Sequence, residues 1–135
     1  GICVYVTDGD TFRVKTDNYG ELVVRFYGID APEKKQVFYQ QSKEFLASLI
    51  LEKPVILLVQ GRDLYGRYIA KVFHEQADVG LVMVRLGFAF WYKSYAKKDK
   101  LLINAEKEAK KQHLGIWGLA KPPVEPWVFR KMKVN

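Results

Sequence analysis

Carboxylates in two separate segments of the sequence could hold a metal ion and activate water. Asp10 belongs to an Asp-Gly-Asp-Thr segment, and Asp30 and Glu33 belong to a Gly-Ile-Asp-Ala-Pro-Glu segment. A hard cation such as Ca²⁺ binds carboxylate and carbonyl oxygens together with water. We therefore expect Asp10, Asp30 and the main-chain carbonyl of Ala31 to be metal ligands. Glu33 follows Asp30 closely, so its carboxylate could position and deprotonate an attacking water molecule.

Two arginines, Arg25 and Arg67, could bind a phosphate group. Arg25 lies just before the second acidic segment, and Arg67 follows an Asp-Leu-Tyr-Gly segment. A guanidinium group is permanently charged, and its paired N–H donors match the geometry of phosphate oxygens. Phosphodiester cleavage builds negative charge on the non-bridging oxygens, so we expect both arginines to stabilise the transition state. Together, these residue types indicate metal-dependent hydrolysis of a phosphodiester bond.

Each of these residues also has an ordinary structural explanation. Asp-Gly is a common pair in tight turns, and an aspartate such as Asp30 before Ala-Pro can cap a turn. Glu33 precedes two lysines and could be a solvated loop residue. Arg25 could face solvent on a strand, and Arg67 could belong to a turn. The catalytic interpretation therefore depends on the combination of the residues and not on any one of them.

Length and composition indicate one domain that attracts polyanions. The chain has 135 residues, of which 49% are hydrophobic, and this is enough for an ordinary core. Its formal net charge of +7 favours nucleic acid as a partner, although charge alone is weak support. Cys3 is the only cysteine, which excludes an internal disulfide and a cysteine-based zinc site. No apolar run in the sequence is long enough to span a bilayer.

A sheet must position these residues, because the first half of the chain is rich in short β-branched and aromatic runs. The expected strands are residues 2–6, 11–15, 22–27, 55–59 and 68–73. The expected helices are residues 41–51, a short helix after Asp78, and residues 98–113. The fourth strand is apolar throughout, which favours a buried strand. This order predicts a mainly β protein with helices (α+β), built on a five-stranded β-barrel of the OB-fold type with about three helices.

Residues 121–135 are expected to form an extended C-terminal tail after a domain of residues 1–120. The tail begins with a proline-rich segment that cannot continue a helix. Trp127 and Phe129 are expected to pack back on the domain. Further upstream, an aromatic cluster around residue 90 could stack on nucleic-acid bases, and Tyr92 is its candidate for substrate binding. Core packing is the alternative for at least half of that cluster.

Three separated motifs resemble the staphylococcal nuclease (thermonuclease) family. These motifs are residues 8–11, 25–33 and 63–67, and they agree with the family in order, spacing and structural context. The resemblance extends from about residue 4 to residue 117. It implies an OB-like five-stranded barrel and Ca²⁺-dependent hydrolysis of DNA and RNA that leaves 3′-phosphate ends. The substrate partner would be DNA, RNA or both.

The resemblance also implies roles for individual residues. By position, the residues similar to the family's functional residues are Asp10, Asp30 and Ala31 for the metal, Arg25, Glu33 and Arg67 for catalysis, Tyr65 for nucleotide contact, and Thr11 beside the metal. Two positions depart from the best-known member of the family. Leu64 stands where that member has a lysine that contacts a terminal phosphate, and Phe90 stands where it has a tyrosine near the bound base. Neither change involves the metal or the scissile phosphate, so both predict altered affinity or product size more than lost chemistry.

Two other functions are compatible with the sequence. One is a non-catalytic module of the same fold that binds nucleic acid or protein, although such modules usually lack some of the metal ligands or arginines. The other is an OB-fold protein that binds single strands and whose acidic motifs are only turns, for which Ca²⁺ would have little effect. We expect a monomer. The resemblance favours a secreted or periplasmic protein, because extracellular calcium can fill a site with few protein ligands.

Overall fold

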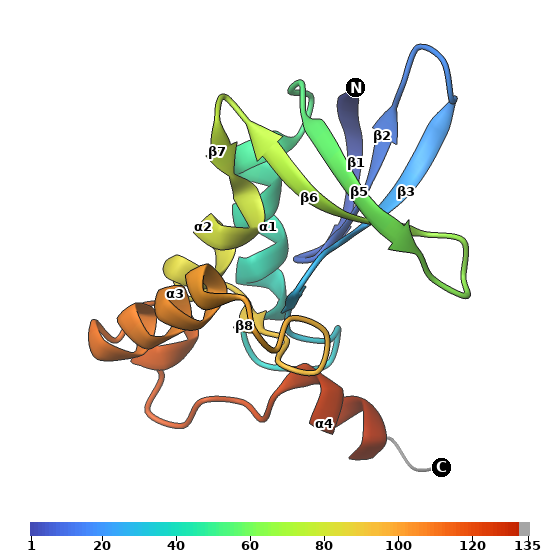
Figure 1. Ribbon diagram of the computed structural model, residues 1–135. Coiled ribbons are helices and arrows are strands. Elements are labelled where there is room, and N and C mark those ends of the chain that lie inside the picture. Colours follow the sequence, from blue (N-terminus) through green and yellow to red (C-terminus); the bar gives the residue numbers. More distant parts are fainter. Residues whose placement is uncertain (133–135) are drawn as a thin grey trace.

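Strands from the first part of the chain form one strongly curved sheet, seen at the upper right of Figure 1. The structure is a computed structural model that describes residues 1–132. The strands are β1 (Ile2–Asp8), β2 (Thr11–Lys15), β3 (Glu21–Phe26), β4 (Ile29–Asp30), β5 (Ile56–Arg62), β6 (Tyr68–His74), β7 (Ala77–Asp78) and β8 (Phe90–Trp91). The main sheet has the order β1-β2-β3-β6-β5, with β7 paired to β6. Strands β4 and β8 form a separate two-stranded sheet.

Helices cover the inner face and one end of this sheet. They are α1 (Tyr39–Ile50), α2 (Val79–Arg85), α3 (Lys100–Lys111) and α4 (Pro126–Met132), with a 3-10 turn, η1 (Gly115–Gly118). Two aspartates begin helices as N-caps: Asp78 Oδ1 accepts a hydrogen bond from Leu81 N, and Asp99 Oδ1 accepts one from Leu102 N. In Figure 1, α1 lies against the sheet and α4 lies apart from the other helices at the end of an extended segment.

Register within the sheet brings the two acidic segments together. Strands β1 and β2 are antiparallel, and the pair Asp8 and Thr11 ends their ladder at the Gly9-Asp10 turn. Thr11 is also the partner of Arg25 in the antiparallel pair of β2 and β3. Because partners in a ladder share one face of the sheet, the start of β2 lies directly beside the end of β3. The Asp10 turn therefore meets the chain just before β4.

The two outer strands of the main sheet approach each other at one end. An isolated bridge pairs Ile2 with Pro54, which lies just before β5. Cys3 adds two main-chain hydrogen bonds, since its N–H donates to the Lys53 carbonyl over 3.1 Å and its carbonyl accepts from Glu52 N over 2.7 Å. The ladder is not continuous around the whole sheet, but these contacts bring β1 and β5 together. The architecture is therefore a mixed α+β, OB-like fold, as predicted from the sequence.

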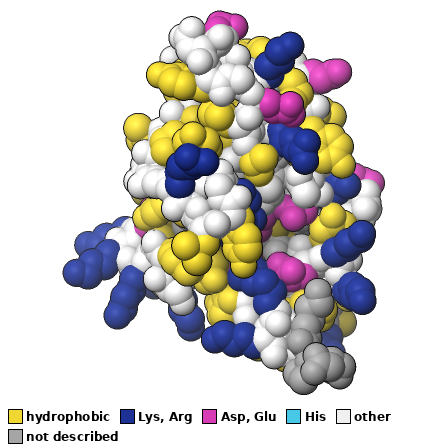
Figure 2. All heavy atoms as spheres, turned by 90° about the vertical axis from the view of Figure 1, so that its right-hand side faces the viewer, with side chains coloured by type: hydrophobic (Ala, Val, Ile, Leu, Met, Phe, Trp, Pro, Cys, Tyr) yellow, Lys and Arg dark blue, Asp and Glu magenta, His cyan; other side chains and the backbone are white. Residues whose placement is uncertain are grey.

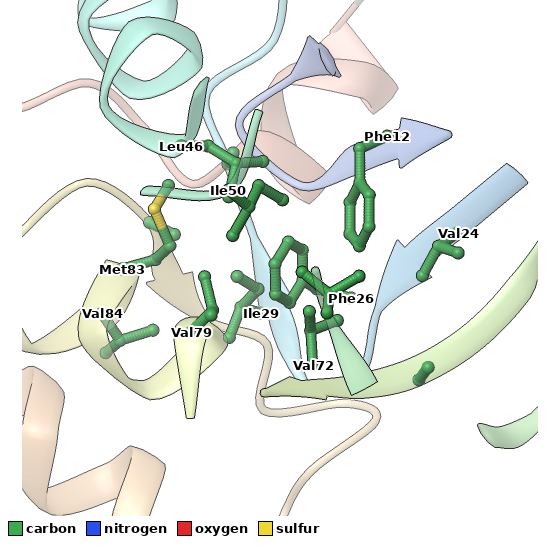
Figure 3. Packing of buried hydrophobic residues seen from close by; sticks show 14 of the residues in the cluster. Phe12, Val24, Phe26, Ile29, Leu46, Ile50, Val72, Val79, Met83 and Val84 are labelled. Atoms are coloured by element: carbon green, nitrogen blue, oxygen red, sulfur yellow. The ribbon is translucent and has the colours of Figure 1, made fainter. Parts of the chain in front are cut away.

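The core lies between the concave face of the sheet and helices α1 and α2, and Figure 3 shows its residues. Phe12 and Phe26 lie on the sheet with ring centroids 5.3 Å apart, and both are buried together with Ile50 of α1. Alternation along β3 turns Val24 and Phe26 inward and leaves Arg25 on the opposite face. The same packing that forms the core therefore aims Arg25 at the outside of the sheet.

All five main strands and all three helices predicted from the sequence are present. Two expectations were wrong in detail. Strand β5 was expected to be buried, but Ile56, Leu58 and Val59 are 72%, 53% and 48% exposed. This strand is at the edge of the sheet, and an apolar run alone does not distinguish an edge strand from a central one.

The C-terminal segment was expected to be extended throughout, but only the part before residue 126 is. Residues 126–132 form helix α4. Its first residue is Pro126, whose fixed φ angle suits the first position of a helix, so the last proline begins a helix where we expected none. The extended conformation predicted for residues 133–135 concerns residues outside those that the structure describes. Among the helices of residues 1–132, none is long and apolar enough to cross a membrane.

Candidate active site

Asp10 is fixed by hydrogen bonds from four directions within the turn between β1 and β2. Its N–H donates to Asp8 Oδ1 over 3.1 Å, and its carbonyl accepts from Phe26 N over 3.0 Å. Its Oδ1 accepts from Thr11 Oγ1 over 3.0 Å, and its Oδ2 accepts from Ala31 N over 2.7 Å. The residue Asp10 as a whole is buried, with 7% of its surface exposed. Thr11 therefore helps to orient the Asp10 carboxylate.

Gly9 allows this turn to approach the second acidic segment. A Cβ atom at Gly9 would lie 2.7 Å from the Cβ of Ala31 and 2.9 Å from the Cβ of Ser42. Real Cβ atoms do not come this close, so a larger residue would push the turn away from Ala31. The glycine of the Asp-Gly-Asp sequence thus allows close packing of the turn against Ala31 and Ser42.

Arg25 connects the two aspartates. Its Nη1 donates to the carbonyls of Phe26 and Ile29 over 3.1 and 2.8 Å. Its Nη2 lies 3.2 Å from Asp30 Oδ1, and its Nη1 lies 3.7 Å from Asp10 Oδ2. The side chain is 13% exposed. The main-chain contacts fix the guanidinium group in one orientation, so its position does not depend on the carboxylates alone.

Asp30 and Glu33 lie on either side of the Ala-Pro pair. Asp30 is fully buried in β4, where it pairs with Phe90 of β8. Glu33 is partly exposed, and its N–H donates to Gln36 Oε1 over 2.8 Å. A buried carboxylate and a more accessible one are suited to different tasks, namely holding a cation and contacting water.

The pKa values of Asp8, Asp10 and Asp30 are all shifted from their ordinary values. Burial and the negative charge of Asp10 raise the pKa of Asp8 to about 8. Burial, opposed by a hydrogen bond from Arg130, raises the pKa of Asp30 to about 6. Burial also acts on Asp10, but the charge of Arg25 and several hydrogen bonds outweigh it and lower the pKa of Asp10. A positive charge added beside these groups would relieve their repulsion.

The donor set fits a hard divalent cation. Asp10 and Asp30 offer buried carboxylate oxygens. Ala31, which lies between Asp30 and Glu33 in the sequence, offers a main-chain carbonyl. Within residues 1–132, no group of three or more Asp, Glu, His or Cys side chains could hold a metal by itself. The remaining ligands would therefore be main-chain oxygen and water, which Ca²⁺ and Mg²⁺ accept and zinc sites rarely use.

Arg67 lies just before strand β6, near the ladder position of Arg25. Arg25 pairs with Ile69 in the parallel ladder of β3 and β6, and Arg67 lies two residues before Ile69, outside the ladder. The Arg67 Nε donates to Asp63 Oδ2 over 2.6 Å. No ion pair joins it to Asp10, Asp30 or Glu33 in the described part of the chain.

The loop before Arg67 projects into solvent. Tyr65 is 84% exposed, and the Arg67 guanidinium lies 5.5 Å from its ring centroid. Leu64, one of the two departures from the family, is fully exposed. Phe90, the other, is buried against the rings of Trp117 and Trp127. The first departure therefore changes an accessible surface, and the second changes internal packing.

Arg130 of helix α4 also lies at this site, and it was not among the residues predicted from the sequence. Its Nη1 and Nη2 bind both carboxylate oxygens of Asp30, and its Nη1 also donates to Glu33 Oε2 over 2.8 Å. Its Nη2 donates to the hydroxyl of Tyr92 over 3.2 Å, so Tyr92 lies at the edge of the site. No local sequence pattern pointed to Arg130, because it is 100 residues from Asp30 and the helix that carries it was not predicted.

The fold and site define a small α+β protein whose carboxylates and arginines are suited to a phosphodiester. Comparison with known proteins agrees: the family model described as "Staphylococcal nuclease homologue" matches residues 13–118. The chain belongs to the staphylococcal nuclease family. Family membership and the relatives below support a nuclease activity and hence a nucleic-acid substrate.

The chain is similar to several bacterial proteins over nearly its whole length. It is 37% identical over 133 residues to an "Uncharacterized endonuclease" of Haemophilus influenzae, which covers 98% of this chain and 74% of the relative. It is 38% identical over 134 residues to an "Uncharacterized endonuclease" of Escherichia coli, covering 98% of this chain and 86% of the relative. It is 32% identical over 145 residues to a "Micrococcal nuclease" of Shigella flexneri, covering 100% of this chain and 82% of the relative.

Proposed function

We propose that this protein is a Ca²⁺-dependent nuclease that hydrolyses phosphodiester bonds of DNA, RNA or both and leaves 3′-phosphate ends. The main support is the convergence of Asp10, Asp30, Glu33 and Arg25 in one site, although they come from separate segments. Arg25 spans the two aspartates, and Glu33 lies at the accessible side of the same group. Family membership supports the same reaction class.

The residues divide the chemistry among them. Asp10, Asp30 and the Ala31 carbonyl would hold Ca²⁺, which when bound supplies a positive charge that polarises the scissile phosphate. Glu33 is partly exposed and would accept a proton from the attacking water. Arg25 is fixed by main-chain carbonyls and would donate to a non-bridging oxygen as charge develops there.

Arg67 and the two tyrosines would contact the substrate around the scissile bond. Arg67 lies two residues before the ladder partner of Arg25, and its pairing with Asp63 would hold it ready to donate its remaining N–H groups to phosphate. Tyr65 is exposed enough to stack on a base. The ring of Tyr92 already contacts the rings of Trp127 and Tyr95, with centroids 5.0 and 4.8 Å away, so its hydroxyl is the group that would meet a nucleotide.

Cleavage of single-stranded DNA and RNA should be measured in Ca²⁺ and in EGTA. We expect cleavage by the wild type in Ca²⁺ and none in EGTA. Glu33→Gln should lower the rate by ~100-fold or more, since general bases contribute about 10²- to 10⁴-fold. Glu44→Gln is the matched control, because it removes the same charge from an exposed position on α1. Undiminished cleavage in EGTA would exclude the calcium mechanism.

Arg67→Ala tests the phosphate contact. Its control is Arg13→Ala, which changes an arginine at an exposed position of β2. We expect Arg67→Ala to lower kcat/KM by about 10²-fold or more, and Arg13→Ala to have little effect. Mapping the ends of the products then tests the position of the phosphate, because 5′-phosphate products would contradict the proposal. Tight binding of nucleic acid without cleavage would instead favour the non-catalytic module.

A further inference from the structure

We propose that Arg130 is a positioning residue of the active site, which holds Asp30 and Glu33 in the arrangement that binds the cation and the attacking water. This inference rests on the proposed function and extends it to the C-terminal helix. It adds a third arginine to the site, with a role unlike those of Arg25 and Arg67.

The Arg130 guanidinium spans the two carboxylates that have separate tasks. Its Nη2 lies 2.8 Å from Asp30 Oδ2 and its Nη1 lies 3.2 Å from Asp30 Oδ1, which is a two-point contact. The same Nη1 donates to Glu33 Oε2 over 2.8 Å. A planar guanidinium group fixes both the distance and the orientation of its partners. The separation of Asp30 from Glu33 is therefore set by one rigid group.

Besides Asp30, which both arginines contact, Arg25 and Arg130 contact different carboxylates. Arg25 contacts both aspartates, whereas no ion pair joins Arg130 to Asp10 in the described part of the chain. Both guanidinium groups therefore contact Asp30. Of the two, it is Arg130 that forms an ion pair with Glu33. This placement assigns Arg130 to support of the carboxylates, while Arg25 lies where the phosphate is expected.

Helix α4 is held beside the site by contacts that do not involve Arg130. Trp127 stacks on Tyr92 with an interplanar angle of 6°, and it meets Phe90 edge-on at 6.2 Å. Gln36 joins the two segments, because its Nε2 donates to the Val124 carbonyl over 2.8 Å while its Oε1 accepts from Glu33 N. Figure 1 shows α4 beneath the loops around β8. The helix is thus docked on the same loop that carries Glu33.

The choice of arginine follows from the distances. The two carboxylates need donors in different directions, and a lysine ammonium is a single point charge on a flexible chain. Burial would lower the pKa of Arg130, but its bonds to Asp30 and Glu33 outweigh this effect and raise it, so it stays charged. Groups that orient metal ligands typically contribute about 10- to 100-fold in metal affinity or activity.

The test compares Arg130→Gln, Arg130→Lys and Lys131→Gln in the full chain. Lys131 is the matched control, because it removes one positive charge from the exposed neighbouring position of α4. Calcium titration by calorimetry and steady-state cleavage are measured for each. We expect Arg130→Gln to weaken Ca²⁺ binding and lower kcat by ~10- to 100-fold with a smaller change in KM. Arg130→Lys should recover part of both losses, and Lys131→Gln should resemble the wild type.

Two outcomes would overturn the proposal. Tighter Ca²⁺ binding by Arg130→Gln would show that Arg130 competes with the cation for Asp30 instead of positioning it. Equal losses in Arg130→Gln and Lys131→Gln would show a general effect of charge. Trp127→Ala provides a second route, since loosening α4 without touching the carboxylates should also weaken Ca²⁺ binding.

A double-mutant cycle separates this inference from the proposed nuclease activity. Unfolding of Arg130→Gln, Glu33→Gln and the double variant in calcium-free buffer measures the coupling of the two side chains, whether or not the protein cleaves nucleic acid. We expect the double variant to lose less stability than the sum of the single variants. Additive losses would overturn the Arg130 contact, while a wild type inactive in Ca²⁺ would overturn only the nuclease proposal.

Discussion

Ser42 allows a test of how much a single buried hydroxyl contributes to stability. It is fully buried on α1, and its Oγ donates to the Phe88 carbonyl over 2.6 Å. Ser48 on the same helix donates to the Phe45 carbonyl over the same distance but is exposed. The two contacts have the same length, but the buried one joins residues 46 apart and the exposed one joins residues 3 apart.

We expect Ser42→Ala to lower the free energy of unfolding by about 1–3 kcal/mol, because the Phe88 carbonyl would lose its donor away from water. Ser48→Ala should change it by less than about 0.5 kcal/mol, since water can replace the hydroxyl. The gain in helix propensity is shared by the two variants, so it cancels in the comparison. Urea unfolding monitored by tryptophan fluorescence measures both values, and equal losses would contradict the role assigned to burial.

Most of the candidate site could be predicted from individual residues, because its parts are close in sequence. Asp30, Ala31 and Glu33 are neighbours, and Arg25 lies only five residues before Asp30. Asp10 was also predictable, because a turn between two recognisable strands places it at the end of the sheet. Arg130 was not predictable in this way, since it is 100 residues from Asp30 and no local pattern announces an ion pair over that separation.

The connection after α2 depends on a glycine that no other residue could replace easily. Gly87 has a φ angle of 82°, and a Cβ atom there would collide with the Leu114 carbonyl and with Gly115. The Ile116 N–H donates to the Gly87 carbonyl over 2.8 Å, so the two segments cross at close range. Gly20, with a φ angle of 71°, turns between β2 and β3 with nothing within 4 Å of such a Cβ atom.

We expect Gly87→Ala to destabilise the protein by more than about 2 kcal/mol, because backbone strain adds to a collision with main chain. Gly20→Ala should cost only the strain, about 1 kcal/mol. Thermal unfolding of the two variants measures the difference directly. Similar melting temperatures for both would mean that the segments can separate without loss, contrary to the packing described here.

The elements that sequence patterns predicted were those with a strong period. Strands β1, β2, β3 and β6 and helix α3 show clear alternation or helical spacing, and all were found. Helix α4 has seven residues, as α2 does, but the sequence lacks there the N-cap aspartate and the terminal glycine that indicated α2. Its packing against Tyr92 and Phe90 is a tertiary contact that the sequence does not display. The exposure of β5 likewise depends on its place at the sheet edge.

The charge of the whole molecule should control how it captures its substrate. The formal charge is +7, yet the site itself gathers carboxylates. Figure 2 shows acidic side chains in the middle of one face, with Lys and Arg side chains distributed around them. An acidic centre within a basic surface attracts a polyanion over long range and leaves the centre to a cation.

Binding of a single-stranded oligonucleotide by Glu33→Gln should therefore weaken steeply with salt. Each phosphate contact contributes about 0.7 to the slope of log affinity against log salt, so three contacts predict a loss of roughly 20-fold between 50 and 200 mM salt. Fluorescence anisotropy in EGTA measures this slope without cleavage. An affinity that does not change with salt would contradict the proposed electrostatic capture.

The ion pairs between Asp30 and Arg130 also have a consequence for the timing of protein synthesis. They join residues 100 positions apart, and the sheet that carries Asp30 is encoded long before helix α4. At about 5–20 residues per second, a ribosome needs roughly 5–20 s to add that interval. During this time the nascent chain can fold its strands but lacks the guanidinium group that joins Asp30 to Glu33. Each newly made molecule therefore completes this acidic centre only after helix α4 has been synthesised.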